Sequence, residues 1–280
     1  MPEPFRYCLN TSTLRGYHLT LAELVEVAGD AGYRGIEPWT DEIARHRDEG
    51  GSLPDLAARI RDRGLVVESA IGFAEWVVDE PERRAKGLEQ MRRDMGLVAA
   101  IGGTRIAAPP AGATDDAGLS LVAAAERYAA VLRLGEEAGV APQVEVWGFS
   151  RALSRLGDAL YVAVESGHPR ACVLPDVYHL YKGGSPFSGL RLLSPSAIGV
   201  FHVNDYRADP PREAIRDSDR VLPGDGIAPL STVVQALAAI GYRGALSLEL
   251  FNPAYWQGDP RAVARKGLAA VRACVRRALV

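Results

Sequence analysis

Residues 198–205 read Ile-Gly-Val-Phe-His-Val-Asn-Asp, an apolar run that ends in polar side chains able to bind a metal ion. The run has the length and composition of a buried strand, and His202 lies at its centre. Four other apolar runs end in a carboxylate, namely Glu37, Glu145, Asp176 and Glu249. If these strands lie parallel in one closed sheet, their carboxyl ends meet on one face. We therefore expect the imidazole and the carboxylates to converge there as an active site.

The rest of the chain alternates strand-like and helical segments. Strand-like apolar runs also occupy residues 5–9, 33–37, 65–70, 104–108, 142–146, 171–176 and 245–250. Apolar residues recur at helical spacing in residues 21–31, 53–63, 81–101, 119–138, 150–166, 229–240 and 260–278, and a short helical piece lies near Leu190. Thr20 is a possible N-cap of the first of these helices. Eight strand and helix units in 280 residues predict an α/β fold, a single (β/α)8 TIM barrel. We expect one domain over residues 1–280, with the active site at the C-terminal ends of the strands.

An internal repeat supports the barrel. Residues 31–37 and 240–249 both contain a glycine that ends a helical pattern, then Tyr-Arg-Gly, then a strand that finishes in Glu. A doubly wound open sheet is the alternative fold, but no glycine-rich phosphate-binding fingerprint follows the first strand. Between the last two strands we expect a long polar loop at residues 206–227.

Composition limits the class of protein. A content of 48% hydrophobic and 24% charged residues is ordinary for a globular chain. The formal net charge of -3 provides no basic field for phosphates, so we expect no nucleic-acid partner. Three cysteines without a CxxC pair indicate reduced thiols. Since the sequence shows neither a secretory signal pattern nor an apolar run of about 18 residues, we expect a cytoplasmic protein without membrane contact.

Four adjacent units each carry a metal-binding group at the strand end. The groups are Glu145, Asp176, His202 and Glu249. One such acid alone is more often a structural partner of a basic side chain or a helix N-terminus, but four of them in apolar runs would be costly to leave unpaired. Three carboxylates and an imidazole suit Mn²⁺ or Mg²⁺ and also accept Co²⁺ or Zn²⁺. We therefore predict one divalent metal ion.

Further side chains are expected near the same face. His179 follows the sixth strand and Arg220 lies in the long loop, so both could contact a substrate; the alternatives are a backbone-bonded loop histidine and a solvated charge. Glu37 and Glu68 also end strands. Aromatic residues beyond strand ends could cover the apolar face of a sugar ring, although aromatics more often pack in a core. These residues are Trp39, Phe73, Trp76, Trp147 and Trp256.

The motifs around these residues resemble a known family. The relevant runs are Val144-Glu145-Val146, Leu-Pro-Asp-Val-Tyr-His at 174–179, Phe-His-Val-Asn-Asp at 201–205, Arg-Val-Leu-Pro-Gly-Asp-Gly at 220–226 and Leu248-Glu249. In order and spacing they resemble the xylose-isomerase-like TIM barrels over nearly the whole chain. Within that superfamily the sequence is most similar to the sugar phosphate isomerase/epimerase group, which includes D-tagatose 3-epimerase and inosose dehydratase.

The resemblance implies roles for individual residues. It implies that Glu145, Asp176, His202 and Glu249 bind one ion, commonly Mn²⁺, and that Glu145 and Glu249 form the acid/base pair. It also implies that His179 and Arg220 contact the substrate, and we add Glu37, Asp205, Trp39 and Trp147 to the expected contacts. Two departures argue against free ketohexose epimerisation: Glu145 is followed by Val-Trp-Gly-Phe instead of Asn-Arg, and residues 206–219 form a longer, more charged loop.

The predicted activity is metal-dependent isomerisation or epimerisation of a sugar or keto-sugar. One Glu would remove the proton beside a carbonyl to form an enediolate, and the other would return it. Loss of a β-hydroxyl would instead give a lyase acting on a keto-polyol or keto-glycoside, which is the first alternative. A non-catalytic sugar-binding barrel and an abasic-site endonuclease are further alternatives.

The expected partner is a small carbohydrate. The absence of a P-loop and of a nucleophile elbow excludes phosphoryl and acyl transfer by those routes. An abasic-site endonuclease of this superfamily needs several ions and many histidine ligands, whereas the chain has five histidines. The resemblance also implies a homo-oligomer, a dimer or a tetramer.

Overall fold

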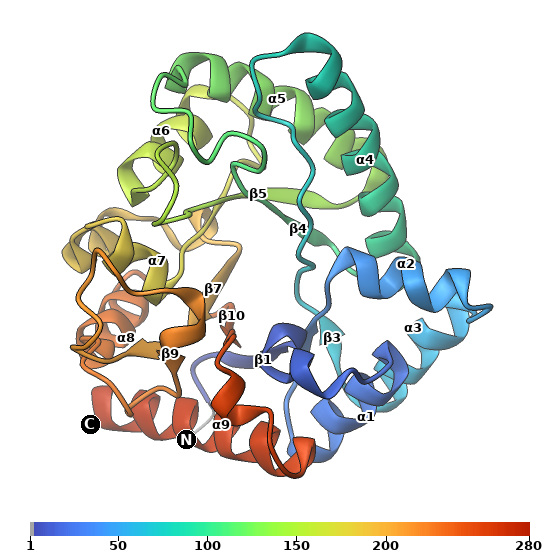
Figure 1. Ribbon diagram of the computed structural model, residues 1–280, viewed down its shortest axis with the longest axis vertical. Coiled ribbons are helices and arrows are strands. Elements are labelled where there is room, and N and C mark those ends of the chain that lie inside the picture. The colour runs from blue at the N-terminus through green and yellow to red at the C-terminus, as the bar shows by residue number, and fades with distance from the viewer. Residues whose placement is uncertain (1–2) are drawn as a thin grey trace.

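Parallel strands form a closed ring at the centre of the structure, and helices surround the ring (Figure 1). The structure is a computed structural model that describes residues 3–280. The strands of the ring are β1 (Arg6–Asn10), β2 (Gly35–Glu37), β3 (Val66–Val67), β4 (Arg105–Ala108), β5 (Ala141–Glu145), β6 (Val173–Leu174), β7 (Val200–Val203) and β10 (Ala245–Leu248).

Two ladders and a few single hydrogen bonds close the ring. One ladder has the order β3-β2-β1-β10-β7 and the other has the order β4-β5-β6, all with parallel pairing. A parallel bridge between Asp176 and His202 joins β6 to β7. On the other side, the Ala107 N–H donates to the Ala70 carbonyl over 2.8 Å and so joins β4 to the end of β3. The predicted (β/α)8 TIM barrel is therefore confirmed.

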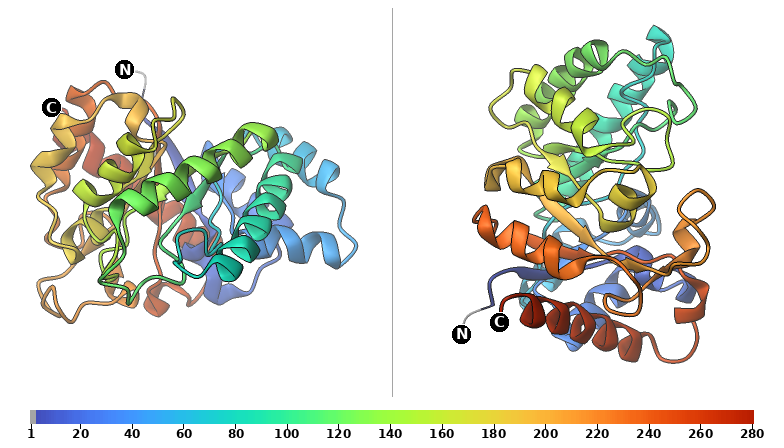
Figure 2. Two further views of the ribbon diagram at one scale, coloured as in Figure 1. Left: turned by 90° about the horizontal axis from the view of Figure 1, so that it is seen from above. Right: turned by 90° about the vertical axis from the view of Figure 1, so that its left-hand side faces the viewer.

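Helices cover the outside of the ring in every view (Figures 1 and 2). Thr20 begins the first helix with a capping box to Glu23, as its sequence predicts. The helices are α1 (Leu21–Ala31), α2 (Thr40–Asp48), α3 (Leu53–Asp62), α4 (Pro81–Ala100), α5 (Leu121–Ala138), α6 (Leu156–Glu165), α7 (Val177–Lys182), α8 (Leu230–Ala239) and α9 (Pro260–Ala278). Short 3-10 turns are η1 (Thr11–Tyr17), η2 (Phe187–Leu192), η3 (Pro195–Ala197), η4 (Asp217–Asp219) and η5 (Pro253–Tyr255).

The structure differs from the sequence prediction in three segments. Helix α2 was not predicted because its buried residues are only Thr40 and Ile43, too few for an apolar period. Helix α7 has six residues, which is too short to show a helical period. The predicted loop 206–227 contains an antiparallel pair of short strands, β8 (Asp205–Tyr206) and β9 (Arg220–Val221). This pair carries Arg220 back to the mouth of the barrel.

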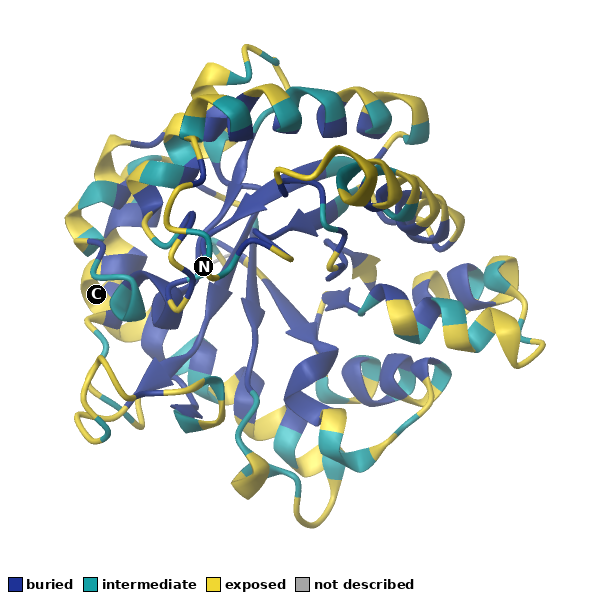
Figure 3. Cartoon of the chain, turned by 45° about the horizontal axis from the view of Figure 1, so that its top comes forward, coloured by how far each residue is buried: buried dark blue, intermediate teal, exposed yellow. Residues whose placement is uncertain are grey.

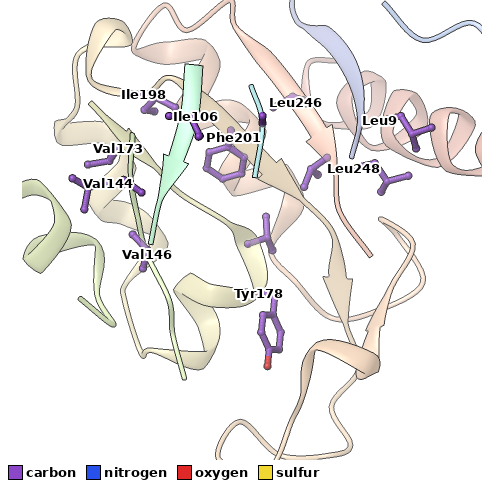
Figure 4. Close-up of a cluster of buried hydrophobic side chains, with 14 of the residues drawn as sticks. Leu9, Ile106, Val144, Val146, Val173, Tyr178, Ile198, Phe201, Leu246 and Leu248 are labelled. Atoms are coloured by element: carbon purple, nitrogen blue, oxygen red, sulfur yellow. The ribbon is translucent and has the colours of Figure 1, made fainter. Parts of the chain in front are cut away.

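Strand side chains alternate between two environments. One set joins the helices in the large apolar core, and it includes Leu9, Ile106 and Phe201 (Figure 4). The other set faces the inside of the ring, where two small clusters form apart from the main core. They consist of Cys8, Val200 and Ala245, and of Ile71, Ala107 and Leu174.

Burial follows this layered arrangement. The strands are buried throughout most of their length, and the helices expose their outer sides (Figure 3). Within residues 3–280, no helix combines the length and the apolar character that crossing a membrane requires.

Candidate active site

His202 forms the centre of a buried polar network at the carboxyl end of the barrel. Its Nε2 lies 2.9 Å from Oε2 of Glu37, which also accepts hydrogen bonds from Ser247 Oγ (2.6 Å) and Asn10 Nδ2 (3.0 Å). Strand register brings these groups together, because Asn10 pairs with Glu37 and Ser247 pairs with His202. Since a carboxylate oxygen accepts, Nε2 carries the proton in this contact. Glu37 thereby fixes the orientation of the imidazole ring.

The other ring nitrogen of His202 faces two carboxylates. Nδ1 lies 3.2 Å from Oε2 of Glu249 and 3.8 Å from Oδ2 of Asp176. It is buried and has no hydrogen-bond partner among the described residues. One ligand atom each from Asp176, His202 and Glu249 lie within 4.8 Å of one another. These three residues could therefore hold one metal ion.

Neighbouring amides orient the two carboxylates. Asp176 caps the N-terminus of α7 by accepting the His179 N–H over 2.8 Å, and its second oxygen accepts Asn204 Nδ2 over 2.8 Å. Asn10 Nδ2 donates to Oε1 of Glu249 over 3.1 Å and so links this residue to the Glu37 network. The short strand ends therefore place both acids in fixed positions around the imidazole.

Glu145 lies at the edge of this group. It faces the same cavity as Glu249, but it is not one of the three residues whose ligand atoms lie within 4.8 Å. Its Oε2 is buried without a hydrogen-bond partner in the described part of the chain. Burial, together with the charge of Glu249, raises the pKa of Glu145 to about 8. Glu145 is thus a carboxyl group available to an ion or a proton.

Arg220 is buried among these acids. Its Nη1 lies 2.6 Å from Oε2 of Glu249 and 3.2 Å from Oδ2 of Asp176. Only 1% of the side chain is exposed, so the alternative of a solvated loop charge is excluded. Although burial alone would raise the pKa of Glu249, His202 and Arg220 hold it well below its ordinary value. The site therefore contains one acid whose charge is balanced by basic groups, Glu249, beside one acid of raised pKa, Glu145.

His179 lies on the far side of Arg220. Its Nε2 is 3.0 Å from Arg220 Nη2, and its Nδ1 accepts the backbone N–H of Gly148 over 3.2 Å. Burial and the adjacent guanidinium lower the pKa of His179 well below its ordinary value. Gly148 must be glycine, because a Cβ there would lie 2.2 Å from the carbonyl oxygen of His179. Because Gly148 has no Cβ, the loop that contains Trp147-Gly148-Phe149 can pack closely against α7.

A cavity of about 220 Å³ lies over this polar group. Glu145, His179, Arg220 and Glu249 line its polar side. Its walls are aromatic and form a chain of ring contacts with centroid distances between 5.0 and 6.0 Å. In the order of those contacts they are Phe251, Trp39, Phe73, Trp147 and Phe149. Trp39 and Trp147, which we expected to contact a substrate, are part of these walls.

Several expected contacts lie elsewhere. Glu37 is fully buried behind His202, so it supports the imidazole and does not line the cavity. Asp205 does not reach the cavity either, because its carboxylate accepts four backbone N–H groups and closes its own loop. Glu68 points to the amino end of the barrel and pairs with Arg6 over 2.5 Å. Trp76 is buried against Tyr128, and Trp256 packs against Gly16.

The sequence analysis did not single out several residues of this network. Asn10 and Ser247 contact Glu37, Asn204 contacts Asp176, and Asp217 hydrogen-bonds Arg220. Asn10 ends β1 as the predicted acids end their strands, so a search for any polar residue at a strand end would have found it. Asp217 lies on the loop before β9, and no local pattern marks it.

Comparison with known proteins shows the family of the chain. The chain belongs to the xylose isomerase-like TIM barrel family, whose family model matches residues 25–274. An inosose isomerase of Halalkalibacterium halodurans is 33% identical over 105 residues, which are 38% of this chain and 37% of that protein. A 3-dehydroshikimate dehydratase of Pseudomonas aeruginosa is 29% identical over 262 residues, which are 89% of this chain and 39% of that protein. The chain therefore matches less than half the length of either relative.

A solved structure has the same fold. The IolI protein with a bound zinc atom superimposes with a TM-score of 0.90, over 98% of this chain and 99% of that chain, at 19% identity. At this identity the likeness concerns the fold alone.

Proposed function

We propose that this protein is a divalent-metal-dependent isomerase or epimerase acting on a keto-sugar or a cyclic keto-polyol. The observation that carries the proposal is the buried Nδ1 of His202, which has no hydrogen-bond partner within residues 3–280. This nitrogen faces Asp176 and Glu249, while Glu37 holds the opposite ring nitrogen. A histidine that binds a metal ion through one ring nitrogen is usually held by a carboxylate at the other ring nitrogen.

The charges of the site also fit a cation. Glu145 and Glu249 line the cavity and Asp176 lies beside His202, so three carboxyl groups gather here, and among the described residues only Arg220 and His202 oppose them at short range. A divalent ion held by Asp176, His202 and Glu249, with Glu145 as the fourth ligand, would neutralise the remaining charge. Oxygen donors with one imidazole favour Mn²⁺, and Mg²⁺, Co²⁺ or Zn²⁺ also suit the set.

Each residue of the site would have its own role in the proposed reaction. When bound, the ion would polarise a substrate carbonyl and make the neighbouring C–H more acidic. Glu249, which its lowered pKa keeps ionised, would accept that proton, and Glu145, whose raised pKa lets it carry a proton, would donate one from the other side. Arg220 and His179 would orient the substrate's oxygens, and the aromatic walls would exclude water.

The cavity favours a single small ring as substrate. Its volume of about 220 Å³ lies below the roughly 300–1,000 Å³ of sites for drug-sized ligands. Aromatic walls suit the C–H faces of a six-membered ring, whereas the polar side suits its oxygens. A monosaccharide or an inosose fits this description better than an oligosaccharide does.

Two glutamate substitutions test the proposal. We expect the purified protein to bind one equivalent of Mn²⁺ and to exchange solvent deuterium into positions beside the carbonyl of an inosose or a ketose. Glu145→Gln and Glu249→Gln should each reduce that exchange by roughly 10²–10⁴-fold, because each removes a proton carrier. Glu126→Gln, an exposed position on α5, is the matched control and should leave exchange unchanged. Wild-type protein that exchanges nothing with Mn²⁺ present would refute the proposal.

A dehydratase is the second candidate. It is favoured by the match to 3-dehydroshikimate dehydratase over 89% of this chain. The same proton removal followed by loss of a β-hydroxyl would give an unsaturated product and water. Ultraviolet absorbance of a conjugated enone distinguishes the two outcomes, since isomerisation and epimerisation retain every hydroxyl group.

A further inference from the structure

Arginines gather around a second cavity, at the opposite end of the barrel. This cavity has a volume of about 730 Å³, and four arginines line it: Arg6, Arg105, Arg170 and Arg243. Arg6 and Arg105 begin β1 and β4, Arg170 precedes β6, and Arg243 precedes β10. The cavity is therefore formed where the amino ends of the strands meet.

Two of these arginines begin strands of the barrel, and their side chains face the inside of the ring. Arg6 and Arg105 stand two residues before Cys8 and Ala107, which belong to the apolar clusters inside the ring. Since side chains on a strand alternate, Arg6 and Arg105 also face the inside of the ring.

The charges at this cavity are not balanced by the protein. Arg6 pairs with Glu68, but Arg105, Arg170 and Arg243 have no acidic side chain within 4.0 Å in residues 3–280. No Asp or Glu lies among the described residues that line the cavity. This local excess of positive charge occurs in a chain whose formal net charge is -3. Guanidinium groups that line one cavity repel one another, and an anion bound among them would relieve that repulsion.

We propose that this arginine-lined cavity binds a small polyanion, a molecule with two or more phosphate or carboxylate groups. Guanidinium groups bind both kinds of anion through paired N–H donors. Thr104, Ser194 and Ser196 add hydroxyl groups to the same lining. The volume lies within the roughly 300–1,000 Å³ of small-molecule sites, so a compact ligand fits better than a nucleic-acid duplex. None of these residues belongs to the proposed active site.

Titration calorimetry of the whole chain tests this site. Inorganic pyrophosphate and citrate are titrated separately in 50 mM and 300 mM NaCl, which also distinguishes phosphate from carboxylate recognition. We expect saturable binding of one equivalent, weakened by the higher salt concentration. The double variant Arg105→Gln/Arg170→Gln should bind at least about tenfold more weakly, since it removes two charge-assisted contacts.

A matched variant and a second site variant control for charge and folding. Arg133→Gln/Arg207→Gln removes the same charge from exposed positions outside the cavity and should bind like the wild type. If Arg105→Gln/Arg170→Gln has a lower melting temperature than the wild type, the single variant Arg243→Gln provides the same test from an exposed position. Equal affinity of wild type and cavity variants, no binding of either anion at 50 mM NaCl, or preferential binding of a 20-base-pair duplex would each overturn the proposal.

Discussion

The two ends of the barrel are built from the same strands but carry opposite charges. At the carboxyl end, Glu37, Asp176 and Glu249 each lie within hydrogen-bond or ion-pair distance of His202 or Arg220. At the amino end, three of four arginines have no ion-pair partner among the described residues. The contacts among the buried charges hold a fixed geometry at the carboxyl end, as catalysis requires. At the amino end the arginines face solvent, and the anion that we propose would supply the opposite charge.

The largest expected effect comes from removing the central imidazole. His202→Asn should abolish binding of one equivalent of Mn²⁺ and reduce deuterium exchange by about 10³-fold or more, because the metal-dependent step is lost. Metal analysis and exchange on the same sample provide the measurement. By contrast, Arg105→Gln/Arg170→Gln should leave both unchanged. Loss of exchange in that double variant would show that the two ends do not act separately.

The support of the imidazole should matter less than the imidazole itself. Glu37→Gln should weaken Mn²⁺ binding by about 10–100-fold, because the residue that orients His202 changes from an acid to an amide. Glu68→Gln is the matched control, since Glu68 is equally buried but pairs with Arg6. Competition with a metal indicator measures both. Similar affinities for the two variants would mean that Glu37 does not support the site.

Ion binding should depend on pH at the carboxyl end. Burial and Glu249 raise the pKa of Glu145 to about 8. Although burial opposes it, Glu249 and Glu37 also raise the pKa of His202. A metal ion must displace these protons, so its affinity should rise from pH 6 to pH 8, by up to about tenfold per pH unit for each proton released. Titrations at several pH values check this, and an affinity that stays constant would contradict it.

Substitution of a buried acid that belongs neither to the proposed active site nor to the arginine-lined cavity should have the smallest effect on function. Asp94 on α4 is 9% exposed, and its Oδ2 has no hydrogen-bond partner among the described residues. Burial raises its pKa from 3.8 to about 6, so its ionisation costs stability above pH 6 and the cost disappears below about pH 4. Asp94→Asn should therefore stabilise the fold by about 1–2 kcal/mol at pH 8.

Denaturant unfolding of both proteins measures this difference in stability. At pH 4 the wild type and Asp94→Asn should unfold at nearly the same denaturant concentration. Metal binding and exchange should stay as in the wild type at pH 8. A variant less stable than the wild type at pH 8 would contradict the assignment of Asp94 as an unpaired charge.

Local patterns in the sequence predicted much of this molecule. Alternating units predicted the barrel, and acids at strand ends predicted the residues that meet around His202. Helix starts such as Thr20 were predictable because capping depends on a few neighbouring residues. The short elements α2, α7, β8 and β9 were not predictable, since tertiary contacts and not periodicity stabilise them.

The sequence by itself therefore determined the fold class and the polar side chains that end the strands. Only the tertiary structure decided which partner each of them meets. Glu37 supports His202 because the pairing of strands far apart in sequence brings the two together. Asp205 instead accepts hydrogen bonds from the loop that follows it. The arginine-lined cavity likewise joins residues from position 6 to position 243. Side-chain alternation is a property of the local chain, whereas contact across a barrel depends on the register of its strands.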